Sequence, residues 1–377
     1  MKYRRKLFFK NTPYNLNETE NLFFEAVKEN FEFQYNNCPE YKTIMESRNF
    51  SPDDLNEDSD IEKIPFLPTL FFKKHEIFSM PKNKIPVKAT SSGTKGVFSN
   101  IGFEISSLLC ALNMVFKVTK EKKLFSLCPS NYIVFGYKPH KSNKTAVTKN
   151  AYLTTLMTPA LHRTYALKYA NGSYSPDLEG VIKAIIKHSK SRFPLRFMGF
   201  PSYTYFVLKM MDERNLRVSL PKNSKIMLGG GWKQFYKEEV DKQTLYNLAK
   251  KVLNVDEENI IEFFGAVEHP ILYCDCKNHH FHVPIYSRVI IRDVHTLEPV
   301  ENGKIGLVNL VTPLVKATPI LSIMTDDLGI LHNAEDCGCG NPSPYLEIIG
   351  RVGVKDIKTC ASGAAELLSG LEVKKWF

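Results

Sequence analysis

The spacing of apolar residues changes along the chain and divides it into regions. Between residues 17 and 50 the apolar positions recur at helical spacing, and we expect Asn17 to cap this helix. Ile105–Phe116 is apolar enough for a buried helix. From about residue 120 to 265, short apolar runs alternate with amphipathic segments. This alternation predicts an α/β fold with a mostly parallel sheet.

The α/β region has a clear set of expected elements. The predicted strands are Leu124–Pro129, Tyr132–Tyr137, Leu195–Gly199, Ile226–Leu228 and Asn259–Phe264. The predicted helices are Leu178–Ser189, Ser202–Arg214 and Glu238–Leu253. Strands of this kind, separated by amphipathic helices, are typical of βαβ units.

Helical periodicity almost disappears after residue 270, and short β-like runs replace it. These runs are Ile271–Cys274, His282–Ile285, Val289–Arg292, Lys304–Asn309, Leu321–Met324 and Tyr345–Ile349. We therefore expect a large domain over residues 1–350, with an α/β part at about 60–269 and a β-rich part at about 270–350. A short C-terminal segment, residues 351–377, would follow a hinge and hold one helix at Ser362–Leu368.

Composition is that of a soluble globular protein, with 43% hydrophobic and 24% charged residues among 377. The sequence contains no apolar run of about 18 residues, so we expect no membrane span. The basic N-terminus has no apolar run behind it and does not resemble a secretory signal. Eight cysteines without such a signal favour the reducing cytoplasm. The net charge of +10 comes from scattered lysines, which does not favour nucleic-acid binding.

One short stretch concentrates hydroxyls, glycines and a positive charge. It consists of Thr90, Ser91, Ser92, Gly93, Thr94, Lys95 and Gly96. Glycines allow a close approach of the backbone, and successive N–H groups with hydroxyls form a concave site for anions. The chemical interpretation is a loop around the phosphates of a nucleotide, and the alternative is a polar surface turn. The spacing differs from that of the P-loop.

Other candidate residues follow predicted strands, where ligands bind in open α/β sheets. Gly229, Gly230 and Gly231 could let a flat ring lie against bare backbone, or form a flexible turn. Glu268 follows the strand ending at Phe264 and could hold Mg²⁺ against phosphate oxygens, although a single Glu is more often a surface residue.

Two further candidates lie in the β-rich region and directly after it. Asp327, within Thr325-Asp326-Asp327, could accept both ribose hydroxyls of a nucleotide. Arg351, within the segment Gly350-Arg-Val-Gly, could pair with phosphate or ribose. Each of these signals is weak when taken alone.

The order of these motifs resembles the adenylate-forming superfamily of acyl-CoA synthetases. The length and the C-terminal phrase from Gly350 to Leu368 look most like its acyl-protein synthetase (LuxE-like) family. The resemblance covers about residues 60–370 and implies ATP-dependent activation of a fatty acid. It implies that residues 90–96 bind phosphate, that the three glycines lie along adenine, and that Glu268 binds Mg²⁺. It further implies that Asp327 holds the ribose and that Arg351 begins the hinge.

The chain departs from the superfamily pattern in three places. Lys95 replaces the second Thr of the usual loop, and Asp326 replaces the Gly of the usual Thr-Gly-Asp. The C-terminal part is far shorter than the usual lid, so the catalytic lysine of that lid cannot be assigned. Lys374 and Lys375 are weak substitutes for it.

Cys360 is the candidate acyl acceptor. It precedes the predicted helix Ser362–Leu368 and lies near Lys355 and Lys358, and both features favour the thiolate. The resemblance implies that a cysteine near the C-terminus receives the acyl group. The alternative is a structural cysteine, in which case the chain would be an acyl- or aryl-CoA or carrier-protein ligase.

Two Cys-x-Cys pairs suggest a metal site. Cys274, Cys276, Cys337 and Cys339 could ligate a structural Zn²⁺, with three histidines, His279, His280 and His282, between the pairs. The alternatives are reduced thiols without metal or a redox role. A third class of function is a zinc-containing binding or scaffold subunit without catalysis.

The expected ligands and partners follow from the leading interpretation. They are ATP, Mg²⁺, a small-molecule carboxylic acid, and an acyl-accepting or reductase protein. The Met, Phe and Tyr side chains at residues 198–211 suggest an apolar acyl pocket.

Overall fold

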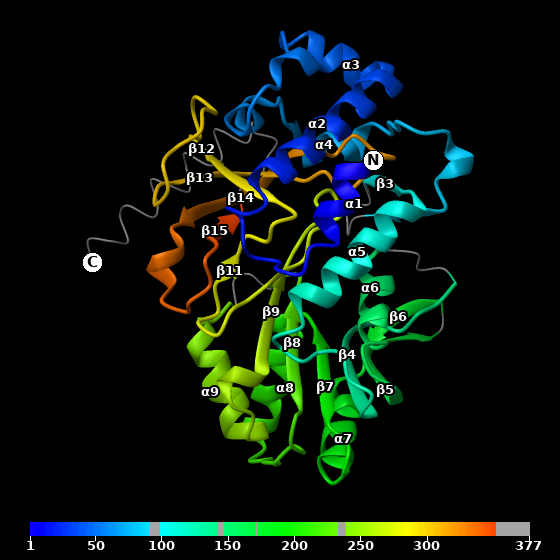
Figure 1. Cartoon of the computed structure of the whole chain (residues 1–377). Coiled ribbons are helices and arrows are strands. Elements are labelled where there is room, and N and C mark those ends of the chain that lie inside the picture. The colour runs from blue at the N-terminus through cyan, green and yellow to red at the C-terminus, as the bar shows by residue number, and fades with distance from the viewer. Residues whose placement is uncertain (91–98, 142–145, 171, 233–238, 352–377) are drawn as a thin grey trace. The chain divides into compact units, whose positions relative to one another are not determined.

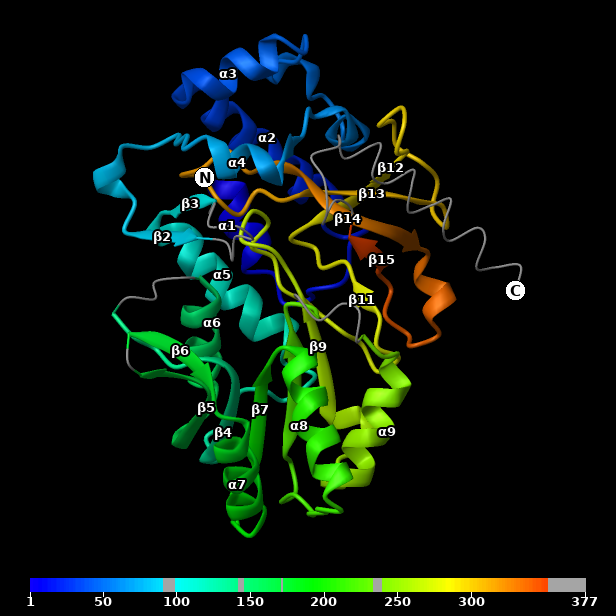
Figure 2. The ribbon, with the colours of Figure 1, turned by 180° about the vertical axis from the view of Figure 1, so that it is seen from behind.

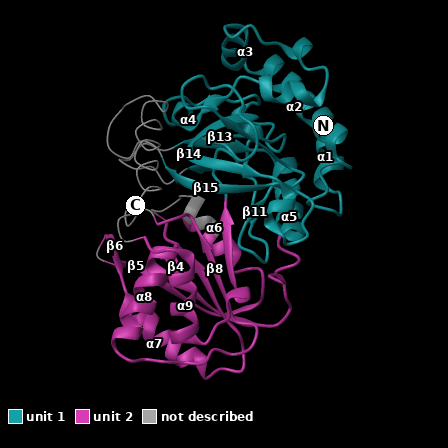
Figure 3. Cartoon of the chain, turned by 90° about the vertical axis from the view of Figure 1, so that its left-hand side faces the viewer, with its two compact units in different colours: residues 1–118, 265–377 teal, residues 119–264 magenta. Residues whose placement is uncertain are grey.

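The computed structural model describes residues 1–90, 99–141, 146–170, 172–232 and 239–351, and Figure 1 labels its elements. The chain forms two compact units, which Figure 3 colours separately. Unit 1 comprises residues 1–118 and 265–377, and unit 2 comprises residues 119–264. Unit 2 is therefore inserted into the sequence of unit 1.

The strands of unit 2 form a mostly parallel sheet, as the alternating pattern predicts. They are β4 (Ser130–Tyr137), β5 (Ala160–Ala170), β6 (Ser173–Pro176), β7 (Leu195–Gly199), β8 (Lys225–Gly229) and β9 (Ile260–Phe264). Their order is β9-β8-β7-β4-β5-β6, and the described pairs are parallel except for β5 with β6. Seven of the eight β4 residues are buried, which is typical of a strand covered on both faces.

Unit 2 has four described α-helices, and an aspartate caps two of them. The helices are α6 (Ala146–Thr154), α7 (Leu178–Ser189), α8 (Pro201–Glu213) and α9 (Lys242–Leu253). Asp177 accepts the N–H of Gly180 at 3.0 Å before α7, and Asp241 accepts the N–H of Thr244 at 2.8 Å before α9. Helices α8 and α9 pack side by side over the strands, as Figure 2 shows. Their apolar faces, with that of α7, complete the core of unit 2.

The α-helices described in unit 1 are α1 (Lys2–Phe8), α2 (Glu20–Asn37), α3 (Pro39–Glu46), α4 (Thr69–Lys74) and α5 (Ile105–Val118). The helical spacing predicted at residues 17–50 is confirmed, but the helix is broken in two. Cys38 is extended and Pro39 begins α3, a position where proline fits because its missing N–H is not needed. Thr19, not Asn17, occupies the cap position of α2.

The β-rich character of residues 270–350 is confirmed by the sheet of unit 1. Its strands are β1 (Leu67–Pro68), β11 (Phe281–His282), β12 (Arg288–Arg292), β13 (Ile305–Val311), β14 (Ser322–His332) and β15 (Tyr345–Arg351). The order is β11-β15-β14-β13-β12, all antiparallel, with β1 beside β14 in parallel. Two further short elements are the hairpin β2 (Val87–Thr90) and β3 (Asn100–Phe103), and β10 (Tyr273–Cys274).

Two sequence-based expectations need correction, and three elements had not been predicted. Leu124–Pro129 is irregular rather than a strand, and Ser126 in it donates its N–H to Met157 O. Residues 146–176 hold α6, β5 and β6, which the pattern did not predict. Ile105–Phe116 is helical, but one of its sides is exposed rather than buried. Among the described residues, no helix combines the length and apolar character needed to cross a bilayer.

Candidate functional site

The β2–β3 hairpin positions the ends of the serine- and glycine-rich loop. Thr90, the last residue of β2, pairs with Asn100, the first residue of β3. The rest of the predicted phosphate loop, Ser91, Ser92, Gly93, Thr94, Lys95 and Gly96, lies outside the described residues. Below the hairpin, Thr318 Oγ1 accepts the N–H of Gly102 at 2.9 Å and donates to its carbonyl at 3.2 Å. Strand β3, which follows the loop, is therefore joined to the segment between β13 and β14.

Glu268 lies next to the end of the same loop. Its side chain is 5% exposed and accepts a hydrogen bond from the hydroxyl of Ser99, which is fully buried. Ser99 follows Gly96 by three residues, so the contact brings the predicted magnesium ligand to the predicted phosphate loop. The sequence analysis did not identify Ser99, although its place just beyond the loop was a possible signal. A carboxylate oxygen beside a phosphate loop is a chemically suitable Mg²⁺ ligand.

His269 is fully buried behind Glu268 and holds a polar cluster together. Its Nε2 lies 3.0 Å from Ser287 Oγ, which in turn lies 2.7 Å from the hydroxyl of Tyr273. Burial lowers the pKa of His269 to about 3, so the imidazole is neutral at neutral pH. The neutral, enclosed imidazole directly follows Glu268 in sequence and contacts the side chains of Ser287 and Tyr273.

Asp327 and Arg351 face each other on neighbouring strands. They are paired residues of β14 and β15, and Arg351 Nε lies 3.8 Å from Asp327 Oδ1. Arg351 Nη2 also lies 3.8 Å from Asp326 Oδ2, which accepts from Thr69 Oγ1 at 3.4 Å. The structure thus brings two predicted nucleotide ligands together at the end of β15. Their side chains are partly exposed, so a ribose or phosphate could reach them.

The three glycines lie in unit 2, at the end of β8. Gly229 closes the strand, and Gly230 and Gly231 have φ angles of 84° and 65°. Few other residues adopt such angles readily, which explains the glycines at these two positions. The structure also identifies Gly199 at the end of β7, where an added Cβ would lie 2.3 Å from the carbonyl oxygen of Phe135. The close approach of Phe135 therefore requires glycine at 199, and Gly230 and Gly231 supply the bare backbone that a site for a flat ring requires.

Two segments of unit 1, residues 276–282 and 337–339, bring four candidate metal ligands together. One ligand atom from each of Cys276, His282, Cys337 and Cys339 lies within 4.8 Å of the others. The sulfurs of Cys276 and Cys337 are 3.6 Å apart, and Cys339 Sγ lies 3.2 Å from His282 Nε2. Three of the four predicted cysteines are therefore confirmed as neighbours. The fourth ligand atom belongs to His282, because Cys274 lies within β10 and outside this group.

The surroundings of this cluster orient its ligands. The carbonyl oxygen of Ser343 contacts His282 Nδ1, which leaves Nε2 directed at Cys339. Backbone N–H groups of Asn278 and Asn341 donate to the sulfurs of Cys276 and Cys339, each at 3.3 Å. Contacts of both kinds are typical of the outer shell of a metal site. The donor set fits a tetrahedral Cys₃His centre.

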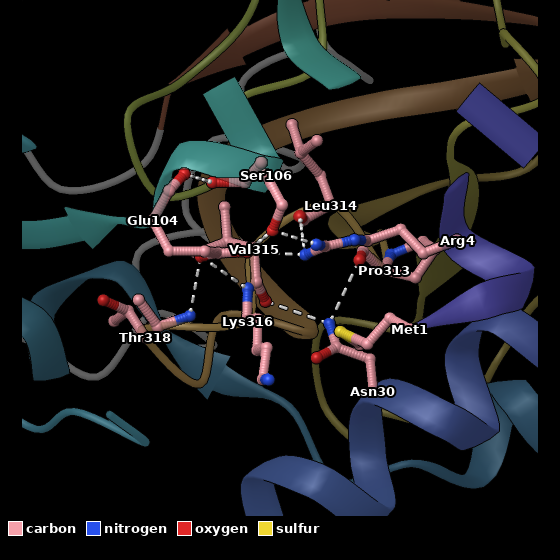
Figure 4. Close-up of polar contacts among 12 residues, drawn as sticks. Met1, Arg4, Asn30, Glu104, Ser106, Pro313, Leu314, Val315, Lys316 and Thr318 are labelled. Carbon is pink, nitrogen blue, oxygen red and sulfur yellow. Dashed lines mark hydrogen bonds and ion pairs between the residues drawn. The ribbon is translucent and has the colours of Figure 1, made fainter. Parts of the chain in front are cut away.

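A second polar cluster, drawn in Figure 4, connects α1 to the body of unit 1. Arg4 Nη1 donates to Glu104 Oε1 at 2.7 Å and to the carbonyl of Leu314 at 2.9 Å. Glu104 Oε2 accepts the N–H groups of Lys316 and Ala317 at 3.3 and 3.1 Å. Arg4 and Glu104 are 3% and 5% exposed. Glu104 directly follows β3, so this buried ion pair secures the base of the hairpin that carries the serine- and glycine-rich loop.

Cys360, the predicted acyl acceptor, lies outside the described residues, as do Lys374 and Lys375. Its role stays a prediction from the sequence, and so do the hinge after Arg351 and the domain boundary at residue 350. The described part of the chain includes the predicted site residues Glu268, Asp327, Arg351, Thr90 and the three glycines.

Comparison with known proteins identifies related sequences over nearly the whole chain. A sequence model of the acyl-protein synthetase (LuxE) family matches residues 4–369. A long-chain-fatty-acid–luciferin-component ligase of Aliivibrio fischeri is 26% identical over 96% of this chain and 93% of the relative. A protein of the same name from Vibrio harveyi is 23% identical over 94% of this chain and 91% of the relative.

Solved structures support the same fold. A crystal structure of 2-hydroxyisobutyryl-CoA ligase with its acyl-adenylate and CoA aligns with a TM-score of 0.68. It is 13% identical and covers 91% of this chain and 72% of its own. The predicted adenylate-forming fold is therefore confirmed, and ligases of this fold use ATP with Mg²⁺. The chain belongs to the acyl-protein synthetase family, and it is a ligase that activates a fatty acid as an acyl-adenylate and transfers the acyl group to a thiol.

Proposed function

We propose that the substrate is a long-chain fatty acid and that the thiol receiving its acyl group is Cys360. The long-chain substrate is supported by the names of the two ligases to which the chain is similar. In the first step the fatty-acid carboxylate attacks the α-phosphorus of ATP and pyrophosphate leaves. In the second step the sulfur attacks the carbonyl carbon of the acyl-adenylate, and AMP leaves with the bonding electron pair.

One observation supports the first step most directly, and it is the contact between Ser99 and Glu268. It holds a buried carboxylate beside the end of a loop rich in hydroxyls and glycines. Glu268 would hold Mg²⁺ there, and the ion would offset charge on the phosphates of ATP. Thr90 and the rest of the loop would surround those phosphates. Asp327 and Arg351 would contact the ribose, and Gly229 to Gly231 would contact adenine.

The thiol acceptor follows from the family and from the position of Cys360. A sulfur on the same chain reaches the adenylate at a high effective concentration, so no diffusing acceptor is needed. The lysines at 355 and 358 favour the thiolate, which is the nucleophilic form. The protein partner would be an acyl acceptor or a reductase that consumes the acyl thioester, and a reducing cytoplasm would keep the thiol free.

Two variants separate the two steps. With ATP, Mg²⁺ and labelled myristate, the unaltered protein should acquire label that hydroxylamine removes. Cys360→Ser should abolish the label but keep fatty-acid-dependent ATP–pyrophosphate exchange. Glu268→Gln should lower that exchange by about 10²-fold or more, because a preorganised charge-stabilising group is lost. Cys128→Ser is the matched control, since Cys128 is an exposed free cysteine of unit 2 and should keep the label.

The outcomes distinguish the alternatives. If Cys360→Ser passes acyl groups to coenzyme A or a carrier protein at the rate of the unaltered chain, Cys360 is structural. Full exchange by Glu268→Gln would remove the assignment of the magnesium ligand. Absence of exchange with any carboxylic acid would leave a scaffold subunit as the better explanation.

We also propose that Cys276, His282, Cys337 and Cys339 bind a structural Zn²⁺. Support comes from the short distances among their ligand atoms and from the outer contacts of Ser343, Asn278 and Asn341. A site closed by four protein ligands is typical of structural rather than catalytic zinc. Elemental analysis of protein purified without a histidine tag should find one zinc per chain. Zinc should be lost in Cys339→Ser but kept in Cys274→Ser, and equal zinc in both variants would contradict this ligand set.

A further inference from the structure

Helix α5 is apolar on two sides, and the described residues cover only one of them. Cys110, Met114 and Val118 face the interior and are at most 4% exposed. On the other side, the exposed fractions of Ile105, Leu109 and Leu112 are 66%, 56% and 68%. At about 100° per residue these three side chains fall on one narrow line along the helix. Leucine and isoleucine exposed singly are ordinary, but a row along one helix face marks an interaction surface.

Helix α1 lies alongside this row and adds positive charge. Arg4 Nη2 donates to Ser106 Oγ at 2.6 Å, and Asn113 Nδ2 donates to the carbonyl of Phe8 at 2.5 Å. These two contacts show that α1 and α5 run side by side in the same direction, as Figure 1 shows. The ammonium group of Lys117 lies 5.9 Å from the ring of Phe9, so the end of α1 is joined to the end of α5.

The outer face of α1 combines lysine and arginine with an exposed aromatic ring. Lys2, Arg5 and Lys6 are exposed, and Phe9 is 49% exposed. With Met1 they line an open depression on the surface of unit 1. We call this face of α1 and the row on α5 the α1/α5 surface.

The charges of the α1/α5 surface have one sign. Residues 2–10 and 105–120 contain lysine and arginine but no aspartate or glutamate. The neighbouring acid Glu104 is buried against Arg4, and neither contributes to the surface. Glu29 lies at the edge, where it accepts the N–H groups of Lys2 and Tyr3. An apolar row bordered by cations is the composition of helices that lie on anionic lipid.

We propose that the α1/α5 surface docks onto an anionic phospholipid bilayer, from which the enzyme takes its fatty acid. The row lies on a convex helix and the depression beside it is open, so a fluid interface can cover both without a matching shape. The cations then meet lipid phosphates, and the leucines enter the acyl boundary. Delivery of substrate from the bilayer rests on the fatty-acid specificity proposed above, whereas docking itself does not.

Flotation with vesicles tests docking without ATP or fatty acid. The full chain should float with vesicles of phosphatidylcholine and phosphatidylglycerol at low salt and separate from them at high salt. It should not float with phosphatidylcholine alone. Leu109→Gln with Leu112→Gln should weaken binding by roughly tenfold for each leucine, since each loses a buried apolar side chain. Arg5→Gln with Lys6→Gln should lose the preference for the anionic lipid.

Unit 2 supplies a matched control. Leu127 and Leu156 are 93% and 53% exposed, and Leu127→Gln with Leu156→Gln should float like the unaltered chain. All these substitutions are at exposed positions, so circular dichroism and exchange activity with a soluble short-chain acid should not change. With myristate presented in anionic vesicles, the α5 variant should show a raised KM and an unchanged kcat.

Several results would overturn the proposal. The unaltered chain could fail to float with either vesicle, or the unit 2 control could lose binding as much as the α5 variant. If the unaltered chain does not float but the α5 variant fails to pass acyl groups to a protein acceptor, the surface is a protein interface. The docking proposal and the assignment of Cys360 as acyl acceptor can fail separately. If the unaltered chain floats but Cys360→Ser keeps the acyl label, only the acceptor assignment is refuted.

Discussion

Each unit contains an arginine–glutamate pair, and the two pairs differ in almost every respect. In unit 1, Arg4 and Glu104 are buried, 100 residues apart in sequence, and connected to backbone groups of residues 314–317. In unit 2, Arg214 and Glu179 form a two-armed contact on the surface, with side chains 45% and 56% exposed. The same type of ion pair therefore joins segments that are distant in sequence in unit 1, whereas in unit 2 it lies on the surface.

The contrast extends to what holds each unit together. The core of unit 2 comprises apolar side chains from consecutive βα segments, such as Ile133, Ile185 and Val252. Unit 1 relies in addition on polar clusters that join distant segments, namely the Arg4–Glu104 pair and the Cys276–His282–Cys337–Cys339 group. We expect unit 1 to be sensitive to loss of single polar groups or of metal, and unit 2 to respond mainly to changes in packing.

Metal removal should produce the largest difference between the units. Structural zinc contributes about 10–16 kcal/mol of apparent binding energy in zinc-finger peptides, and this energy becomes folding energy. A strong chelator should therefore increase amide hydrogen exchange around residues 274–282 and 337–345. Peptides from α7 and α9 in unit 2 should exchange as before. Equal exchange in all of these peptides with and without chelator would contradict a structural metal.

Removal of Arg4 should have the next largest effect. Arg4→Ala leaves the carboxylate of Glu104 buried without its cation, a loss that costs about 3–5 kcal/mol in comparable buried pairs. Unfolding in denaturant, followed by amide hydrogen exchange, should show a lower free energy of unfolding and reduced protection in α1, β3 and residues 312–318. Arg4→Lys is the matched variant, which keeps the charge but cannot reach Glu104, Leu314 and Ser106 together, so its loss should be smaller. A loss below about 1 kcal/mol for Arg4→Ala would show that the pair is dispensable.

These two expectations also show what the sequence could and could not reveal. The elements of unit 2 were largely predictable because apolar spacing is a local property, and Leu178–Ser189 and Leu195–Gly199 were predicted with the bounds that the structure has. The order of the site motifs was sufficient to indicate the family. By contrast, Arg4 meets Leu314 over 310 residues, a relation that no local pattern contains.

The metal ligands show the same limit at shorter range. Cys274 and Cys276 look equivalent in the sequence, but Cys274 is buried in β10 while the turn at residues 276–280 directs Cys276 to the other loop. His282 was one of three candidate histidines, and only the contact of its Nδ1 with Ser343 O decides which ring nitrogen is available. The exposed row on α5 could not be predicted from the sequence for a related reason, since apolar character alone does not say which side of a helix is covered.

A packing change in unit 2 should have a moderate effect that remains within that unit. Ile185 is fully buried among strand and helix side chains, so Ile185→Val removes one methylene group. Such substitutions typically cost about 0.5–1.5 kcal/mol, partly for the cavity left behind. The unfolding midpoint of unit 2 should fall, while zinc content and the protection of β14 should not change. A loss of protection in β14 would mean that the two units unfold together.

The smallest effect should come from the exposed pair of unit 2, and it completes the comparison with Arg4. Arg214→Ala removes two hydrogen bonds to Glu179, but water solvates both charges in the unfolded chain and nearly as well in the folded one. Exposed pairs of this kind contribute roughly 0–1 kcal/mol, and salt screens what remains. Unfolding should therefore differ slightly from that of the unaltered chain at low salt and not at all at high salt. If Arg214→Ala cost as much as Arg4→Ala, the geometry of the contact rather than its burial would determine the strength of both pairs.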